Sequence, residues 1–195
     1  MEKKIIVIFN IMIFLTTTCS IDGNANCKED FEITDIIGDT NLGLLDIESA
    51  WFYEKQDEPE YLFTALKIKD LKESFNAVFS IRWMYNNEEY VSGLDTFFYR
   101  EKVFRCGLPQ RASYRQWKNM PECEGNLDLE KGIITWRILK SNIGNPVKGD
   151  IITKTRANAV PGFPISFLYF FTGRDYRDFA PDKFGEYGLN YIIQY

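Results

Sequence analysis

Apolar residues recur at every second position along much of this chain. The clearest set is Ala77, Phe79, Ile81, Trp83 and Tyr85. Alternation with a period of two places one apolar face on a half-buried β-strand. Similar runs predict strands over 45–53, 62–68, 88–99, 97–104, 133–139, 151–155, 167–171 and 190–194. Only residues 68–74 have a helical pattern, over one or two turns.

Turn-forming residues separate these runs. Asn86-Asn87 joins two of them, and Asn tolerates the positive φ angles of a two-residue hairpin. About eight strands in roughly 150 residues predict an all-β fold, an antiparallel β-sandwich of the jelly-roll kind. No internal repeat or linker is evident, so residues 26–195 are expected to form a single domain.

The first 25 residues have the pattern of an export signal. Lys3 and Lys4 precede an apolar run, Ile5 to Leu15, and small residues follow at Gly23-Asn24-Ala25. The run is shorter than the about 20 apolar residues that span a bilayer. Residues 1–25 therefore predict a cleaved signal peptide and a secreted or cell-envelope protein. No other feature of the sequence predicts contact with a membrane.

A lipidated cysteine is the alternative for this segment. Bacterial lipoprotein signals end at a cysteine that receives lipid, and Cys19 follows a suitable apolar run. In Leu15-Thr16-Thr17-Thr18-Cys19, however, the Leu is one place too early and Thr stands where smaller residues are usual. Cleavage near Ala25 is the preferred interpretation.

Charge and histidine content exclude several classes of function. The formal net charge is −5, which argues against general nucleic-acid binding because phosphate contacts require clustered Lys and Arg. The sequence contains no histidine. Catalysis by a Ser-His-Asp or Cys-His site, zinc binding through histidine and a histidine pH switch are therefore excluded. No other motif indicates catalysis, so the protein is not expected to be an enzyme.

Cysteine usage fits an oxidising compartment. Cys106 and Cys123 are predicted to form a disulfide, which would stabilise the fold by about 3 kcal/mol on the chain-entropy model. Cys27 would then be free or paired between molecules. Pairing of Cys27 with Cys106 or Cys123 stays open.

Acidic turn residues stand at both ends of the predicted sandwich. Asp35 and Asp39 precede the first confident strand, and Asp178 and Asp182 precede the last. If these strands are neighbours, the four carboxylates can converge on a structural Ca²⁺, which takes six to eight oxygen ligands. Asp46 or Asp175 can join them. The alternative is that these residues only form turns.

A basic segment lies between Cys106 and Cys123. Arg111, Arg115 and Trp117 are its candidate binding residues, with Tyr114 and Lys118 nearby. Arg beside aromatic rings suits recognition of an anionic polymer or a partner carboxylate. A solvated loop is the simpler alternative.

Short motifs along most of residues 31–195 resemble a known superfamily. They are Asp35-x-x-Gly38-Asp39, Leu45-Asp46-Ile47, Ser49 to Phe52, Tyr61 to Leu71, Trp136 to Ile152, and Ala180-Pro181-Asp182 with Gly185 and Tyr187. The chain resembles uncharacterised secreted prokaryotic β-sandwich domains, broadly similar to the DOMON and family-9 carbohydrate-binding superfamily. The resemblance implies the fold more than an activity. Haem binding is not implied, because haem-binding DOMON relatives use Met and His ligands.

These observations favour a non-catalytic binding module with a carbohydrate or surface protein as ligand. Exposed aromatic rings can pack on sugar faces, and the candidates are Trp51, Trp83, Trp136, Tyr85 and Tyr90. Period-2 placement puts most of them in the core instead. The alternatives are a small carboxylate-dependent polysaccharide hydrolase, which needs a pair of acids in an open groove, and a purely structural envelope lipoprotein.

Overall fold

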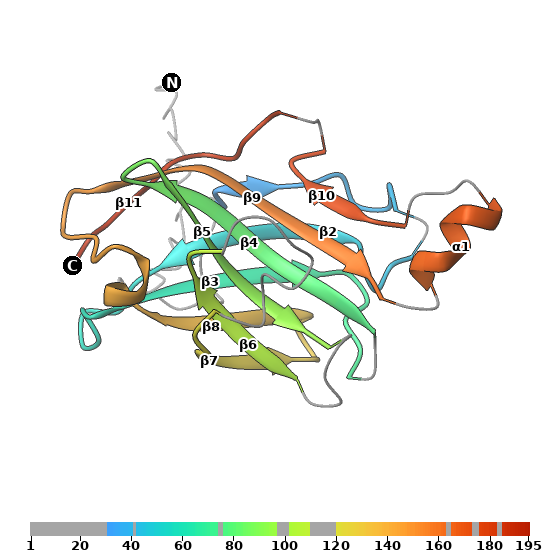
Figure 1. The fold of residues 1–195 in the computed structure, drawn as a ribbon, viewed down its shortest axis with the longest axis horizontal. Helices are drawn as coiled ribbons and strands as arrows, with labels where there is room; N and C mark the ends of the chain where they lie inside the picture. The colour runs from blue at the N-terminus through green and yellow to red at the C-terminus, as the bar shows by residue number, and fades with distance from the viewer. Residues whose placement is uncertain are drawn as a thin grey trace, which may run out of the picture.

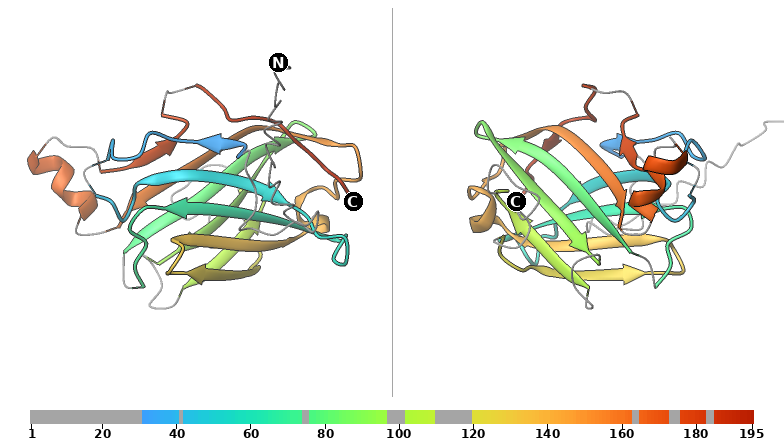
Figure 2. Two further views of the ribbon diagram at one scale, coloured as in Figure 1. Left: turned by 180° about the vertical axis from the view of Figure 1, so that it is seen from behind. Right: turned by 45° about the vertical axis from the view of Figure 1, so that its right-hand side comes forward.

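The protein is an antiparallel β-sandwich, which confirms the predicted all-β fold class (Figure 1). The computed structural model describes residues 31–40, 42–73, 76–96, 102–109, 120–162, 165–172, 176–182 and 185–195, and only the backbone of residues 167–170. The predicted signal peptide, Cys19 and Cys27 lie outside these ranges. Figure 2 shows the two sheets as separate layers.

The first sheet has five strands in the order β1-β2-β3-β8-β7. Their bounds are Ile33–Thr34 (β1), Ile47–Tyr53 (β2), Tyr61–Ile68 (β3), Ile133–Leu139 (β8) and Glu124–Asp128 (β7). The second sheet follows the order β10-β9-β4-β5-β6. Its strands are Asp178–Ala180 (β10), Ile151–Pro161 (β9), Ala77–Tyr85 (β4), Glu88–Asp95 (β5) and Val103–Gly107 (β6).

The last strand, β11 (Tyr191–Ile192), also pairs with β9. It lies beside Ile151 and Ile152, whereas β10 lies beside 157–159. The C-terminal part of the chain therefore follows β9 along its length. Figure 1 shows β10 near the blue segment of residues 31–40, which includes β1, at one edge of the sandwich.

The alternating pattern places the core as predicted. Phe79, Ile81 and Trp83 of β4 are fully buried between the sheets, together with Leu62 and Leu66 of β3. The hairpin between β4 and β5 is also confirmed, because Asn86 and Asn87 have φ angles of 49° and 63°.

A β-bulge in β2 corrects one part of the pattern. The sequence suggests that Leu45, Ile47, Ser49, Trp51 and Tyr53 share a face, but the register shifts between Ile47 and Ser49. One extra residue moves the following side chains to the opposite face. Ala50 and Phe52 therefore enter the main core, and Trp51 packs outside it against Phe31, with ring centroids 4.9 Å apart.

Two predicted elements are wrong. Residues 167–171 are helical, within α1 (Ile165–Thr172), which lies at one end of the sandwich (Figure 1). A short run that is apolar on all sides has no period that separates strand from helix. The predicted helical turns at 68–74 are also wrong over the described residues 68–73, because β3 continues to Ile68 and a turn follows. Among the described helices, none is long and apolar enough to cross a bilayer.

The two sheets are joined by a buried hydroxyl pair. Thr64 of β3 and Ser92 of β5 are fully buried, and their hydroxyl oxygens are 2.9 Å apart. Thr64→Val is expected to lower the free energy of unfolding by about 1–3 kcal/mol, because it leaves the Ser92 hydroxyl without this partner. The double change Thr64→Val with Ser92→Ala is expected to recover most of the loss. Urea denaturation of the three variants measures this, and simple additivity of the single effects would contradict it.

Candidate metal centre

Five aspartates converge beside the first and last parts of the sandwich. Asp35, Asp39 and Asp182 can each place a carboxylate oxygen within 4.8 Å of the others. Asp39, Asp46 and Asp178 form a second such group. Because Asp39 belongs to both groups, the five side chains make one cluster, which we call the aspartate centre.

The loop between β1 and β2 is folded over Asp46. Gly38 has a φ angle of 92°, which favours glycine, and its backbone N–H donates to both Asp46 carboxylate oxygens at 3.0 and 2.9 Å. Asp46 is fully buried, and its carboxylate also pairs with Lys69 at 3.2 Å. These contacts hold Asp35 and Asp39 on either side of the turn.

Asp178 connects the C-terminal segment to β2. Its Oδ2 accepts a hydrogen bond of 2.6 Å from the Ile47 N–H, and its Oδ1 accepts one of 2.9 Å from the Phe179 N–H. The side chain is only 3% exposed. Asp178 thus begins β10 at a fixed position, and Asp182 follows two residues after the strand ends.

Asp35 faces the centre with an unsatisfied carboxylate. Each of its oxygens exposes less than 1 Å² to solvent and makes no hydrogen bond of good geometry, although the Ile36 N–H approaches closely enough to lower the pKa. The carboxylate lies against that of Asp182, so a hydrogen bond between the two requires a proton on one of them. A buried carboxylate without a donor is costly unless it is protonated or bound to a cation.

The electrostatics of the centre favour added positive charge. Burial, the Asp182 contact and the Asp178 charge raise the pKa of Asp35 to about 9. The same causes raise the pKa of Asp39 to about 6, and burial raises the pKa of Asp178. Among the described residues, Lys69 is the cation seen to pair with the centre.

Oxygen ligands in this number suit a hard cation. Ca²⁺ takes six to eight oxygens and tolerates irregular geometry, whereas Mg²⁺ requires a near-octahedral set. Asp46 and Asp178 are already oriented by backbone N–H groups. Asp35, Asp39 and Asp182 are therefore the residues best able to supply direct ligands, with Asp46 and Asp178 behind them.

Four members of this centre are the aspartates that the sequence proposes as calcium ligands. Asp35, Asp39, Asp178 and Asp182 lie together, and Asp46 joins them, as one alternative expected. Asp175, the other, lies outside the described residues. Lys69 was missed, because its approach to Asp46 depends on the pairing of β2 with β3. Whether the centre binds calcium remains a prediction.

Cys106 and Cys123 are neighbours but are free thiols in the structure. A hydrogen bond with the Cys106 thiol and burial raise the pKa of the Cys123 thiol. The backbone around them is also connected, since the Cys106 N–H donates to Pro121 O and the Cys123 N–H to Phe104 O, both at 3.1 Å. The disulfide stays a prediction.

The other predicted binding residues do not form a described surface. Arg111, Arg115 and Trp117 lie outside the described residues. Among the aromatic candidates, Trp51, Trp83, Trp136, Tyr85 and Tyr90 are all buried, with Tyr85 the most exposed at 8%. They cannot form an exposed sugar-binding platform, because they pack within the fold.

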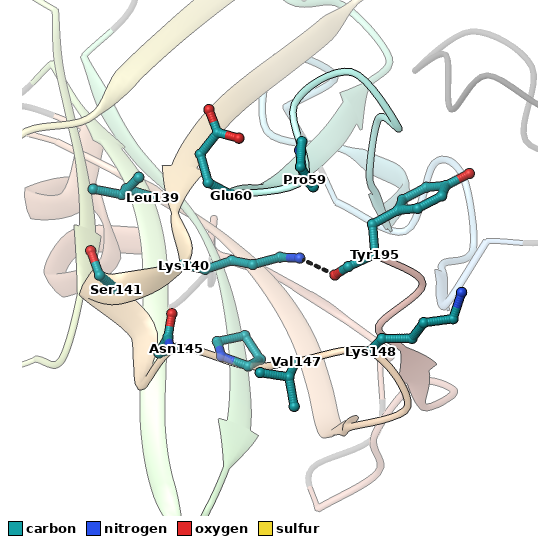
Figure 3. A pocket seen from close by; sticks show the side chains of 10 residues that line it. Pro59, Glu60, Leu139, Lys140, Ser141, Asn145, Val147, Lys148 and Tyr195 are labelled. Carbon is teal, nitrogen blue, oxygen red and sulfur yellow. Dashed lines mark hydrogen bonds between the residues drawn. The ribbon is translucent and has the colours of Figure 1, made fainter.

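Several pockets lie away from this buried aromatic set. One, of about 300 Å³, is near the C-terminus, where Lys140 donates to the Tyr195 carbonyl (Figure 3). A second, of about 470 Å³, is lined by residues of β4, β9 and β10 and by Asp182. The second pocket therefore borders the aspartate centre.

Comparison with protein-family models, curated proteins and solved structures finds no match for this chain. The fold and the aspartate centre define the class of protein as an antiparallel β-sandwich with a clustered carboxylate site.

Proposed function

We propose that this protein is a non-catalytic, extracytoplasmic binding module whose fold is completed by Ca²⁺ at the aspartate centre. Its ligand is a carbohydrate or a surface protein. The observation that carries the metal proposal is the Asp35 carboxylate, which faces other carboxylates with both oxygens buried and without a well-formed hydrogen bond. A bound cation would compensate that charge.

Calcium would have a structural role in this position. Asp35 and Asp39 belong to the loop before β2, and Asp182 follows β10. A cation shared by these side chains would tie the N-terminal loop to the C-terminal segment. The extracytoplasmic location that the sequence predicts is compatible with this proposal, because extracellular modules use calcium sites of this general kind.

The hydrolase alternative is less well supported by the same residues. Asp35 has the raised pKa that a general acid needs. A general acid must also reach the glycosidic oxygen, and both Asp35 oxygens are closed to solvent. A structural envelope protein would share the calcium centre but would need no ligand pocket.

Calcium is expected to raise the thermal unfolding midpoint of the purified protein. At a Ca²⁺ concentration about 100 times Kd, the stabilisation is about 2.7 kcal/mol. For a chain of this size that corresponds to about 5–11 °C. Mg²⁺ should give a smaller shift, and EDTA should reverse the effect; scanning calorimetry measures both.

Charge-neutral variants separate a specific site from general screening. Asp39→Asn and Asp182→Asn change exposed members of the centre, so the metal-free fold should be retained while the calcium shift is lost. Asp57→Asn alters an exposed turn residue elsewhere and should keep the full shift. Equal responses of Asp182→Asn and Asp57→Asn, or no response of the parent protein, would overturn the proposal.

A further inference from the structure

The pocket beside the aspartate centre has an unusual concentration of arginine. It lies on the outer face of the second sheet and measures about 470 Å³, within the range of ligand-binding clefts. Its principal lining side chains are Arg82, Arg156, Asn158, Arg177, Phe179 and Asp182.

Two of the arginines are held side by side by the sheet. Arg82 of β4 is directly opposite Arg156 of β9. The Glu89 carboxylate pairs with both guanidinium groups. Its Oε2 lies 3.3 Å from Arg82 Nη1, and its Oε1 lies 2.7 Å from Arg156 Nη2. Burial lowers the pKa of Arg82, and the Arg156 charge adds to the shift. Two guanidinium groups that share a single carboxylate favour the approach of a second anion.

The pocket also offers contacts for a sugar ring. Phe179 is 42% exposed on the same face, and the Arg177 guanidinium lies 5.5 Å from its ring centroid. Asn158 contributes an amide, which donates to Ser80 Oγ at 2.9 Å. A hexuronate presents a carboxylate for arginine, hydroxyl groups for the amide and a C–H face for the ring. An acidic peptide would supply carboxylates and backbone hydrogen-bonding groups but no C–H face of a sugar ring for Phe179.

Charge balance connects this pocket to the metal centre. Among the described residues, the three arginines of the pocket lie with the acidic lining residues Asp182 and Glu186, and Glu89 pairs with two of them. Asp182 also belongs to the aspartate centre. A cation bound there would share the Asp182 charge and leave the arginines of the pocket less neutralised.

We infer that this pocket binds a uronic acid residue of an acidic polysaccharide, and that binding requires calcium at the aspartate centre. The inference rests on the proposed function and names its ligand. Since coupling between two sites is reciprocal, the acidic sugar should also tighten calcium binding by the same factor.

Calorimetric titration with trigalacturonate tests the inference. A trimer avoids the calcium-induced gelling of long polyuronates. The parent protein is expected to bind the trimer in Ca²⁺. Binding should be at least about tenfold weaker in EDTA and for the methyl ester of the trimer. Arg156→Gln should weaken it by a similar factor, because the change removes charge-assisted hydrogen bonds. Phe179→Ala should also weaken binding, and because the ring is exposed, that variant tests the pocket if Arg156→Gln is unstable.

Arg137→Gln is the matched control. Arg137 also pairs with carboxylates, those of Glu58 and Glu124, but it lies on β8 in the other sheet. Its variant should bind the trimer like the parent protein.

The outcomes separate the two proposals. A calcium-raised midpoint without trimer binding would overturn the ligand and leave the metal centre intact. Equal trimer binding in Ca²⁺ and EDTA would overturn the coupling, and no calcium response would overturn the proposed metal function. Equal binding of penta-glutamate and the trimer would refute the carbohydrate assignment.

Discussion

Lys140→Met is expected to lower the free energy of unfolding by about 3–5 kcal/mol, because it leaves a carboxylate buried without its cation. The Lys140 ammonium lies 2.6 Å from Glu54 Oε1, and the two side chains are 6% and 0% exposed. It also donates to the Tyr195 carbonyl (Figure 3). For a chain of this size the midpoint should fall by about 6–20 °C.

Glu54 makes this effect large because it also holds the C-terminal residues. Its Oε2 accepts a hydrogen bond of 2.6 Å from the Gln194 N–H and one of 3.2 Å from the Tyr191 hydroxyl. Burial and the Glu54 charge raise the pKa of Tyr191, which therefore stays a hydroxyl donor. The ion pair thus ties β2 and the 3-10 helix η2 (Lys140–Ile143) to the last strand.

A double variant and a surface control test this origin. Glu54→Gln keeps a hydrogen-bond acceptor but removes the negative charge. The double variant Lys140→Met with Glu54→Gln should therefore recover much of the stability that Lys140→Met loses alone. Lys131→Met breaks an exposed pair with Asp128, where the ammonium-bearing side chain is 52% exposed. Its effect should stay within about 1 kcal/mol. Similar denaturation midpoints for Lys131→Met and Lys140→Met would contradict the buried-charge explanation.

The sequence predicts those features that depend on local pattern. Period-2 runs identify the core face of β4, and Asn86-Asn87 identifies its hairpin. The aspartate centre was also predictable in part, because turn aspartates flank the strands at both ends of the domain. Its convergence depends on one further fact, namely that β10 lies beside β2, where Ile47 donates to Asp178.

Other features depend on pairings that no local pattern records. Arg82 and Arg156 form a joint site only because β4 is next to β9, although many residues separate these strands along the chain. The Glu54–Lys140 pair likewise joins the end of β2 to η2. The bulge in β2 adds one residue and reverses the faces of those that follow, which alternation alone cannot reveal. The functional surfaces of this sandwich therefore depend on which strands are neighbours, and local sequence patterns do not determine that order.

Without calcium, stability is expected to fall as pH rises from about 4 toward about 9. Asp35 has a pKa of about 9 in the fold and 3.8 as its ordinary value, so the folded protein retains a proton that the unfolded chain releases. The stabilisation from this proton is complete below the ordinary pKa and lost as pH approaches the folded one. The slope is about 1.4 kcal/mol per pH unit for each retained proton. Asp39 should steepen it below about pH 6.

Calcium should abolish this slope, because metal binding displaces protons from its ligands. Urea denaturation between about pH 6 and about pH 8 measures the slope of stability against pH. This interval lies below the ordinary cysteine pKa of about 8.5. The absence of histidine from the sequence leaves this interval with few other titrating groups.

Asp35→Asn should separate the two roles of this side chain. The amide does not titrate, and its N–H groups can donate to the Asp39 and Asp182 carboxylates. The metal-free variant should therefore be more stable than the parent near pH 8 and nearly independent of pH, while its calcium response is reduced. Asp57→Asn should keep the parent slope. A metal-free parent whose stability is flat or rises over this interval would show that Asp35 is ionised without a cation, and the centre would then need no metal.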